Sequence, residues 1–176
     1  MKRRSGWFNI ILLAAGLALA GCKTPEEKRH DDLNAILRVY LGTSPDSTGQ
    51  HQTVEISGVQ LYAGKSHVLD ESSVARATVI STRDGGYALQ VDFDDHGKLV
   101  LDSLTASAKS RHLLIFTQFG VGKTVQDRWL AAPLITQRLR EGQIIFTPNA
   151  TREEALDIAQ GLNNNVEKRT GKAWWR

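Results

Sequence analysis

The sequence predicts an α+β domain in which an antiparallel or mixed sheet carries helices packed on one of its faces. Residues 77–83 and 87–93 flank Asp84-Gly85-Gly86, and residues 87–93 alternate apolar with polar side chains, which is typical of an antiparallel hairpin with one buried face. Residues 151–162 follow a helical period instead and begin with the capping box Thr151-Arg152-Glu153-Glu154. Because hairpins and helices are interspersed along the chain, the pattern favours a single layered domain.

A first helix is expected over residues 25–41. Thr24-Pro25-Glu26-Glu27 has the form of a capping box with proline at the first helical position, and Gly42 suits the helix end. The apolar residues between these two signals recur at helical spacing: Leu33, Ile36, Leu37, Tyr40 and Leu41. The stripe is narrow and flanked by acids as well as bases, so we expect it to pack on the domain; packing on a membrane is the alternative.

The rest of the chain offers shorter signals. A strand is expected over 54–61, with a bulge at Gly58 where the alternation changes phase. The remaining predicted elements are a polar loop at 43–51, a helical turn at 70–74, a helix at 97–108 that buries Val100, Leu101 and Leu104, a central strand at 112–116, a short helix or turn at 133–139, a strand at 143–147, and the helix from 151 that buries Ala155, Ile158, Ala159 and Leu162. After Asn163-Asn164-Asn165 the pattern ends in a basic tail.

Composition limits the class of protein. The 176 residues, 41% of them apolar, suit one domain with appendages, and a single cysteine excludes a disulfide scaffold. The formal charge of +3 comes entirely from Lys2, Arg3 and Arg4, since the rest of the chain carries equal numbers of basic and acidic residues. That balance provides no extended basic surface, so we expect no nucleic-acid partner.

The first 22 residues carry the strongest functional signal. Lys2-Arg3-Arg4 precede an apolar stretch, residues 10–20, that is too short to span a bilayer comfortably and is typical of a secretory signal. Leu19-Ala20-Gly21-Cys22 resembles the lipobox of bacterial lipoproteins, and the only cysteine of the chain lies at the required position. An ordinary secretory peptide with an accidental cysteine, or a short membrane-buried segment, is the alternative.

The lipobox resemblance implies cleavage before Cys22 and acylation of its thiol, with chains such as palmitate. Two or more acyl chains hold a protein on a membrane, where one does not. In Gram-negative lipoproteins an Asp directly after the cysteine tends to retain the protein in the inner membrane. Lys23 therefore resembles the outer-membrane class, and an extracytoplasmic, outer-membrane address is expected in such a cell. The predicted organisation is a signal peptide over 1–21, an anchor-proximal helix and linker over 22–51, a domain over 52–165, and a basic, aromatic tail over 166–176.

Three patterns that suggest chemistry are each interpreted structurally. Gly120-Val121-Gly122-Lys123-Thr124 lacks the first glycine of a phosphate loop, because Thr117 occupies that place, and it lies between strands, so we interpret it as a hairpin turn. The segment 92–97 begins like a calcium loop, but Ser103 occupies the position that needs a bidentate glutamate, which favours a strand end and helix cap. The five histidines show no zinc spacing. We therefore expect no catalytic, cofactor-binding or metal-binding residue.

The tail pairs basic residues with Trp174 and Trp175. Tryptophan favours boundaries between apolar and aqueous surroundings, so these two residues are the candidates for contact with a membrane interface or a partner. A frayed terminus is the alternative.

The C-terminal half resembles a known family. Its motifs are Ala132-Pro133-Leu134-Ile135, Leu139-Arg140-Glu141-Gly142, Ile144-Ile145-Phe146 and Thr151-Arg152-Glu153-Glu154-Ala155, preceded in matching order by Val68-Leu69-Asp70, Leu104-Thr105 and Leu113-Leu114-Ile115-Phe116. Over about residues 66–164, this order is similar to the head subdomain of the first periplasmic domain of SecD in SecDF, the accessory membrane component of the Sec protein-export machinery. The resemblance implies an α+β module that contacts exported chains and has no active site.

The sequence departs from that family in two ways. SecD has several membrane spans that couple to proton flow, whereas this chain shows none after the signal, and the base part of the same periplasmic domain has no counterpart here. We therefore expect a lipid-anchored module that binds exported or envelope proteins or peptides without catalysis. The alternatives are a structural lipoprotein with one fixed partner and, last, an envelope hydrolase.

Overall fold

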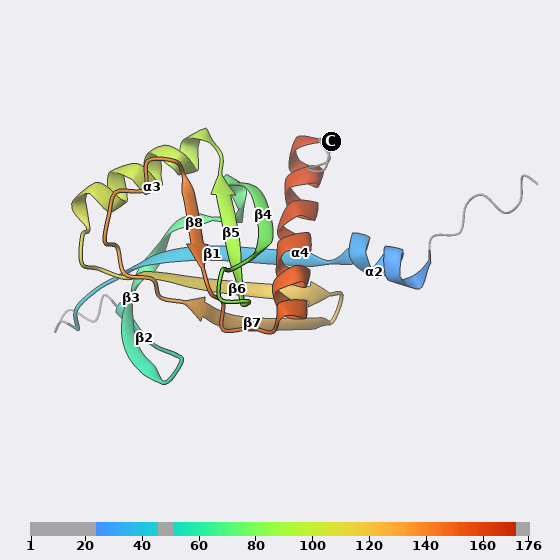
Figure 1. Ribbon diagram of the computed structural model, residues 1–176, viewed down its shortest axis with the longest axis horizontal. Coiled ribbons are helices and arrows are strands. Elements are labelled where there is room, and N and C mark those ends of the chain that lie inside the picture. Colours follow the sequence, from blue (N-terminus) through green and yellow to red (C-terminus); the bar gives the residue numbers. More distant parts are fainter. Residues whose placement is uncertain (1–23, 46–50, 172–176) are drawn as a thin grey trace, which may run out of the picture.

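A computed structural model describes residues 24–45 and 51–171 (Figure 1). Its elements in chain order are α2 (Pro25–Asp32), β1 (Asn34–Gly42), β2 (His51–Ile56), β3 (Val59–Asp70), the 3-10 turn η1 (Glu71–Ser73), β4 (Val74–Ser81), β5 (Tyr87–Phe93), α3 (Asp95–Ser107), β6 (Leu113–Val121), β7 (Thr124–Ala131), β8 (Gln143–Phe146) and α4 (Arg152–Thr170). The α+β prediction is confirmed. All strand pairs are antiparallel, and they form two sheets where one was expected: a five-stranded sheet of order β2-β3-β1-β6-β7 and a three-stranded sheet of order β4-β5-β8.

The main core lies between the two sheets and the helices α3 and α4. Alternate side chains of β1 and β6 meet those of β5 and β8 there, and Leu101 of α3 and Ile158 of α4 complete the packing. Helix α4 contacts β1 and β4, one strand from each sheet, and so holds the sheets together (Figure 1). This arrangement accounts for the buried face predicted for residues 87–93 and for the apolar stripe of residues 155–162.

A second, smaller core lies on the opposite face of the five-stranded sheet. Tyr40 and Leu114 pack there against Val54, Ile56 and Ala63 of the β2–β3 hairpin. Strands β2 and β7 are the two edges of this sheet, yet they contact each other, because the sheet curls around this cluster. The curl brings the tip of the β2–β3 hairpin over the end of β7.

The helix expected over 25–41 is the main error of the sequence analysis. Helix α2 begins at Pro25 with the predicted capping box but ends at Asp32, and it contains no buried residue of its own. Residues 34–42 are instead β1, the central strand of the five-stranded sheet, paired with β3 on one side and β6 on the other. The segment expected to be a helix and linker thus contributes a strand, because the sheet buries both of its faces.

Three local predictions are also corrected. The change of phase at Gly58 comes from a hairpin turn and not a bulge: Ser57 and Gly58 both have positive φ, and Ile56 pairs with Val59 across them. Residues 133–139 form no helix; Leu134 makes an isolated antiparallel bridge with His112. Helix α4 continues through the three asparagines to Thr170, because their amides bind neighbouring backbone.

Candidate functional site

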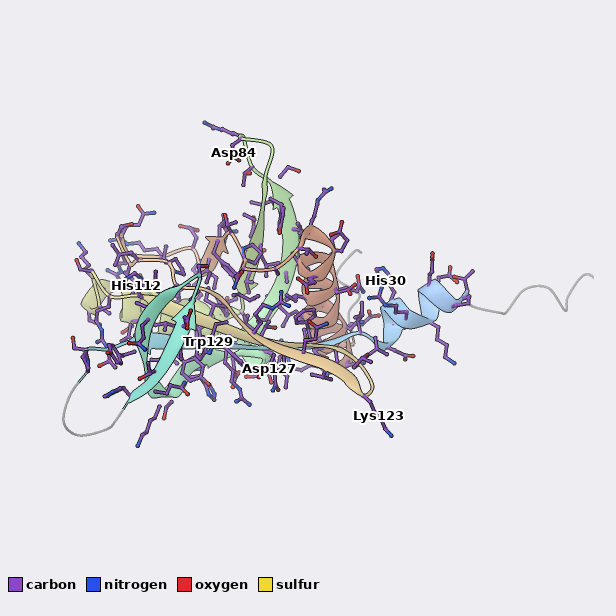
Figure 2. The ribbon with its side chains drawn as sticks, turned by 90° about the horizontal axis from the view of Figure 1, so that it is seen from below. His30, Asp84, His112, Lys123, Asp127 and Trp129 are labelled. Carbon is purple, nitrogen blue, oxygen red and sulfur yellow. The ribbon has the colours of Figure 1, made fainter. Side chains whose placement is uncertain are left out.

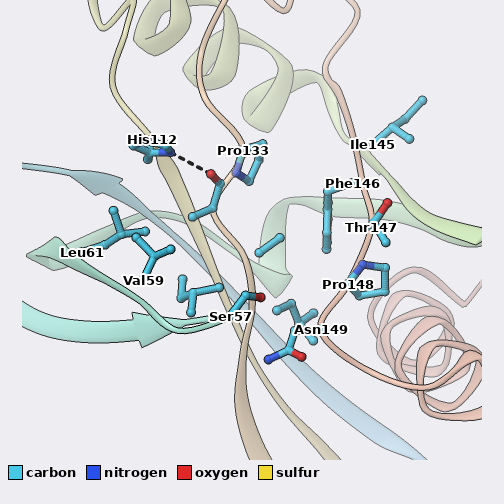
Figure 3. Close-up of a pocket in the computed structure, with 14 residues that line it drawn as sticks. Ser57, Val59, Leu61, His112, Pro133, Ile145, Phe146, Thr147, Pro148 and Asn149 are labelled. Carbon is cyan, nitrogen blue, oxygen red and sulfur yellow. Dashed lines mark hydrogen bonds between the residues drawn. The ribbon is translucent and has the colours of Figure 1, made fainter.

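An open groove of about 620 Å³ lies where three segments meet (Figure 3). One wall is the β2–β3 hairpin with Val59 and Leu61, the second is the chain from Leu130 to Pro133 that leaves β7, and the third is the end of β8 with the loop up to Asn149. We call this the main groove. Its size is within the range of small-molecule and peptide sites.

Local chemistry fixes each wall. The two positive-φ residues of the hairpin turn set the register of β2 and β3, which places Val59, 57% exposed, at the mouth of the groove. Pro133 cannot donate a backbone hydrogen bond and keeps the chain extended after β7. The loop after β8 is held back on β7 because the Asn149 amide donates to the Leu130 carbonyl at 2.7 Å.

The lining is mostly apolar, and its polar residues are Ser57, His112, Thr147 and Asn149. Among the described residues that line the main groove, His112 alone carries an ionisable side chain. Its Nδ1 lies 2.7 Å from the Ala132 carbonyl oxygen, and because a carbonyl only accepts, Nδ1 carries the proton of that bond (Figure 3).

Two smaller pockets share lining residues with the main groove. A pocket of about 140 Å³ shares Pro133 and Ile145 with the groove and is also lined by Leu134; we call it the Leu134 pocket. A pocket of about 410 Å³ shares Leu61 and His112 with the groove and contains Arg111; we call it the Arg111 pocket. We call the three adjoining pockets together the channel; the main groove is its largest and mostly apolar part, and Arg111 supplies positive charge among the described residues of its lining.

The carboxyl groups with perturbed pKa values lie outside this channel. Two hydrogen bonds from Arg128, at 2.8 and 3.0 Å, lower the pKa of Glu154 below its ordinary value, and the backbone amide of Thr151 adds to the effect. The side chain of Arg138 similarly lowers the pKa of Asp102 on α3. These pairs join β7 to α4 and α3 to the chain before β8, so they are structural.

The residues that sequence analysis proposed as contact sites lie elsewhere. Cys22, Trp174 and Trp175 lie outside the described residues. The segment that resembles a phosphate loop is the turn between β6 and β7, as predicted, and Lys123 points away from the molecule at its tip (Figure 2). The segment that resembles a calcium loop ends as a helix cap, also as predicted, because the Asp94 side chain accepts the amide of Gly97 at 2.8 Å.

Neither histidines nor acids gather elsewhere in the described chain. Within residues 24–45 and 51–171, no three His, Cys, Asp or Glu side chains lie close enough to hold a metal ion. No helix in the same ranges is long and apolar enough to cross a membrane. The main groove could not be predicted from the sequence because its walls come from three separate segments, 56–61, 130–133 and 145–149, and its apolar residues have the pattern of ordinary strand and core positions.

Comparison with known proteins identifies the fold. No protein-family model and no curated protein matches the chain. A solved structure of SecDF, described as a membrane component that enhances protein export, is similar with a TM-score of 0.58 and 17% identity, over 83% of this chain and 71% of that one. A structure of SecDF in a super-membrane-facing form has a TM-score of 0.55 and 16% identity, over 81% of this chain and 21% of that one. The chain therefore has the fold of a SecDF periplasmic domain, as the motifs in residues 66–164 suggested.

Proposed function

We propose that this protein is a lipid-anchored module of the bacterial envelope that binds exported or envelope proteins through the main groove and catalyses no reaction. The observation that carries the proposal is the groove itself: an open, mostly apolar site with no acidic, lysine or arginine side chain among the described residues that line it. Such a surface matches the apolar side chains that a protein exposes before it folds.

Two further observations support the proposal. The fold is that of a domain from SecDF, which is described as enhancing protein export. The leader ends in the lipobox at Cys22, and an acyl anchor there would keep the groove near a membrane surface outside the cytoplasm. The imidazole of His112 is the only titratable group on the described lining, which offers little for acid–base or nucleophilic chemistry.

The anchor is tested by labelling cells with radioactive palmitate. We expect the label on the wild-type protein and none on the Cys22→Ser variant, which also keeps its leader because cleavage follows lipidation. A wild-type protein without label, or with its leader still attached, would contradict the anchor and the address that follows from it.

Binding is tested by photocrosslinking in living cells. A photoreactive residue at Val59 or Ile145, both exposed in the groove, is expected to capture many exported chains. Leu99 on α3 is the matched control, because it is an exposed apolar residue that lines none of the three pockets. Capture of one partner in fixed proportion would favour a structural subunit instead, and equal capture at Leu99 would refute the groove as the site.

A further inference from the structure

The open edge of β8 offers backbone hydrogen bonds to the channel. In the ladder between β5 and β8 the Phe93 amide donates to the Gly142 carbonyl at 2.8 Å, so this pair is hydrogen-bonded. Antiparallel pairs alternate, and the N–H and C=O groups of Gln143 and Ile145 therefore point away from β5. Within the described chain no strand lies on that side of β8.

The opposite wall presents a matching group. Leu134 forms a bridge with His112, and beside it the Ile135 amide donates to the Arg111 carbonyl at 2.8 Å. The hydrogen bonds on either side of the His112–Leu134 bridge make it a non-hydrogen-bonded pair of an antiparallel ladder. In such a pair each residue turns its own N–H and C=O away from the other strand, so those of Leu134 point away from residues 111–113. Leu134 and Ile145 line the same pocket, which places two sets of outward-facing backbone groups along one channel.

These groups favour a polypeptide over an acyl chain as the occupant. An extended peptide can pair with an exposed sheet edge through its main chain and place alternate side chains in the pockets beneath. An acyl chain would cover the apolar lining but leave the same backbone groups without partners. Ile145, 50% exposed, and Val59 supply the apolar contacts for those side chains.

The Arg111 pocket supplies charge complementarity. The Arg111 Nε donates to the Gly42 carbonyl at 2.8 Å. This bond orients the guanidinium and leaves its two terminal nitrogens available to a ligand. Among the described residues, Arg111 forms no ion pair, and no acidic residue lines any of the three pockets. An oriented guanidinium of this kind binds carboxylates through two parallel hydrogen bonds. The hydroxyl groups of Thr43 and Ser110 line the same pocket.

We propose that the channel selects extended polypeptide segments in which an acidic side chain flanks a run of apolar residues. The carboxylate binds Arg111, the apolar side chains occupy the main groove, and the backbone pairs with Ile145 and Leu134. This inference rests on the proposed function and adds its sequence preference.

The test uses fluorescent peptides blocked at both ends and the full-length protein in detergent, with binding followed by fluorescence anisotropy. One peptide carries a glutamate beside an alternating valine–threonine run, and its partner carries glutamine at that position. We expect the glutamate peptide to bind about tenfold more tightly, as befits one charge-assisted pair. Arg111→Gln should remove that difference and leave the glutamine peptide unchanged, whereas Lys109→Gln, an exposed control with the same change of charge, should preserve it.

Backbone pairing is tested by peptide N-methylation. Methyl groups on alternate amides should weaken binding in either phase, because the amides of one phase face Ile145 and those of the other face Leu134. Equal affinity of the glutamate and glutamine peptides would overturn the inference while leaving the proposed function intact. Tighter binding of a glutamine peptide with a free C-terminal carboxylate would overturn it in favour of a chain terminus. Displacement by oleate, with peptide binding unaffected by methylation in either phase, would overturn it in favour of a lipid. Binding of no peptide would refute the proposed function itself.

Discussion

Asn163 joins helix α4 to the outer edge of β4. Its Oδ1 accepts the Ala77 amide at 2.9 Å, and its Nδ2 donates to the Ala77 carbonyl at 2.8 Å. Because β4 is an edge strand, the described chain offers these two backbone groups no neighbouring strand on that side. The Asn163 side chain is 1% exposed, so water cannot replace it easily.

Asn163→Ala should therefore lower the free energy of unfolding by about 2–6 kcal/mol. The change leaves one buried donor and one buried acceptor unpaired, and each such group costs about 1–3 kcal/mol. A domain of this size has a total stability of about 5–15 kcal/mol, so the variant should remain folded in buffer but unfold at a clearly lower urea concentration.

The assay is urea denaturation of the full-length protein, followed by circular dichroism and tryptophan fluorescence. Leu156→Ala is the matched control, since Leu156 lies half-exposed on the same helix and its loss should change stability by less than about 0.5 kcal/mol. The denaturant slope should stay constant, which would show that the change is one of stability. A loss below about 1 kcal/mol for Asn163→Ala would refute the reasoning that its amide substitutes for a neighbouring strand.

Three further predictions concern the packing and charges of helix α4. Gly161→Ala normally favours a helix by about 1 kcal/mol, but here the new Cβ would lie 2.7 Å from the backbone of β1, so the melting temperature should fall; a rise would show that the two elements separate freely. The hydrogen bonds of Arg128 lower the pKa of Glu154 in the folded state below its value of about 4.5 in the unfolded chain. The Arg128–Glu154 pair therefore stabilises the fold fully above pH 4.5, and this contribution is lost as the pH falls through the pKa of Glu154 in the folded state. Glu154→Gln should thus flatten the acid decline of the urea midpoint, and an unchanged decline would contradict the assignment. Arg29→Ala should cost less than about 1 kcal/mol in urea, because the Arg29 side chain, paired with Asp157 at 2.6 Å, is 59% exposed; a larger loss would mean that α2 contributes more than its exposed contacts indicate.

The central strand β1 shows why periodicity alone misassigns a segment. Its apolar residues satisfy two patterns at once. Leu33, Ile36, Leu37, Tyr40 and Leu41 fit a helix, whereas Leu33, Ala35, Leu37 and Val39 alternate as in a strand. The decision is made by β3 and β6, which pair with both edges of this segment, and by the two cores that bury both of its faces. None of these partners is visible in the segment's own sequence.

Elements whose signals are local were predicted well. The capping boxes at Thr24 and Thr151 mark true helix starts, and the turn at 84–86 joins a true hairpin. The helix end predicted at the three asparagines was wrong for the opposite reason. Polar residues within a helix pattern suggest an end only until their partners are known, and here those partners lie 86 to 134 positions away. The groove shares this long-range origin.

The asparagine contacts also constrain the order in which the molecule can be completed. Asn164 donates to the Leu33 carbonyl across 131 positions, and Asn165 donates to that of Ala35. The packing around β1, the first strand, is therefore complete only after α4, the last helix, has formed. A chain that emerges from its N-terminus first cannot seal β4 until residue 163 has arrived. Until then that strand is an unprotected template for pairing with other chains, and folding so rich in distant contacts is slow. Before residue 163 has emerged, this protein is therefore itself an incompletely folded chain with an exposed strand, of the kind that we propose it binds.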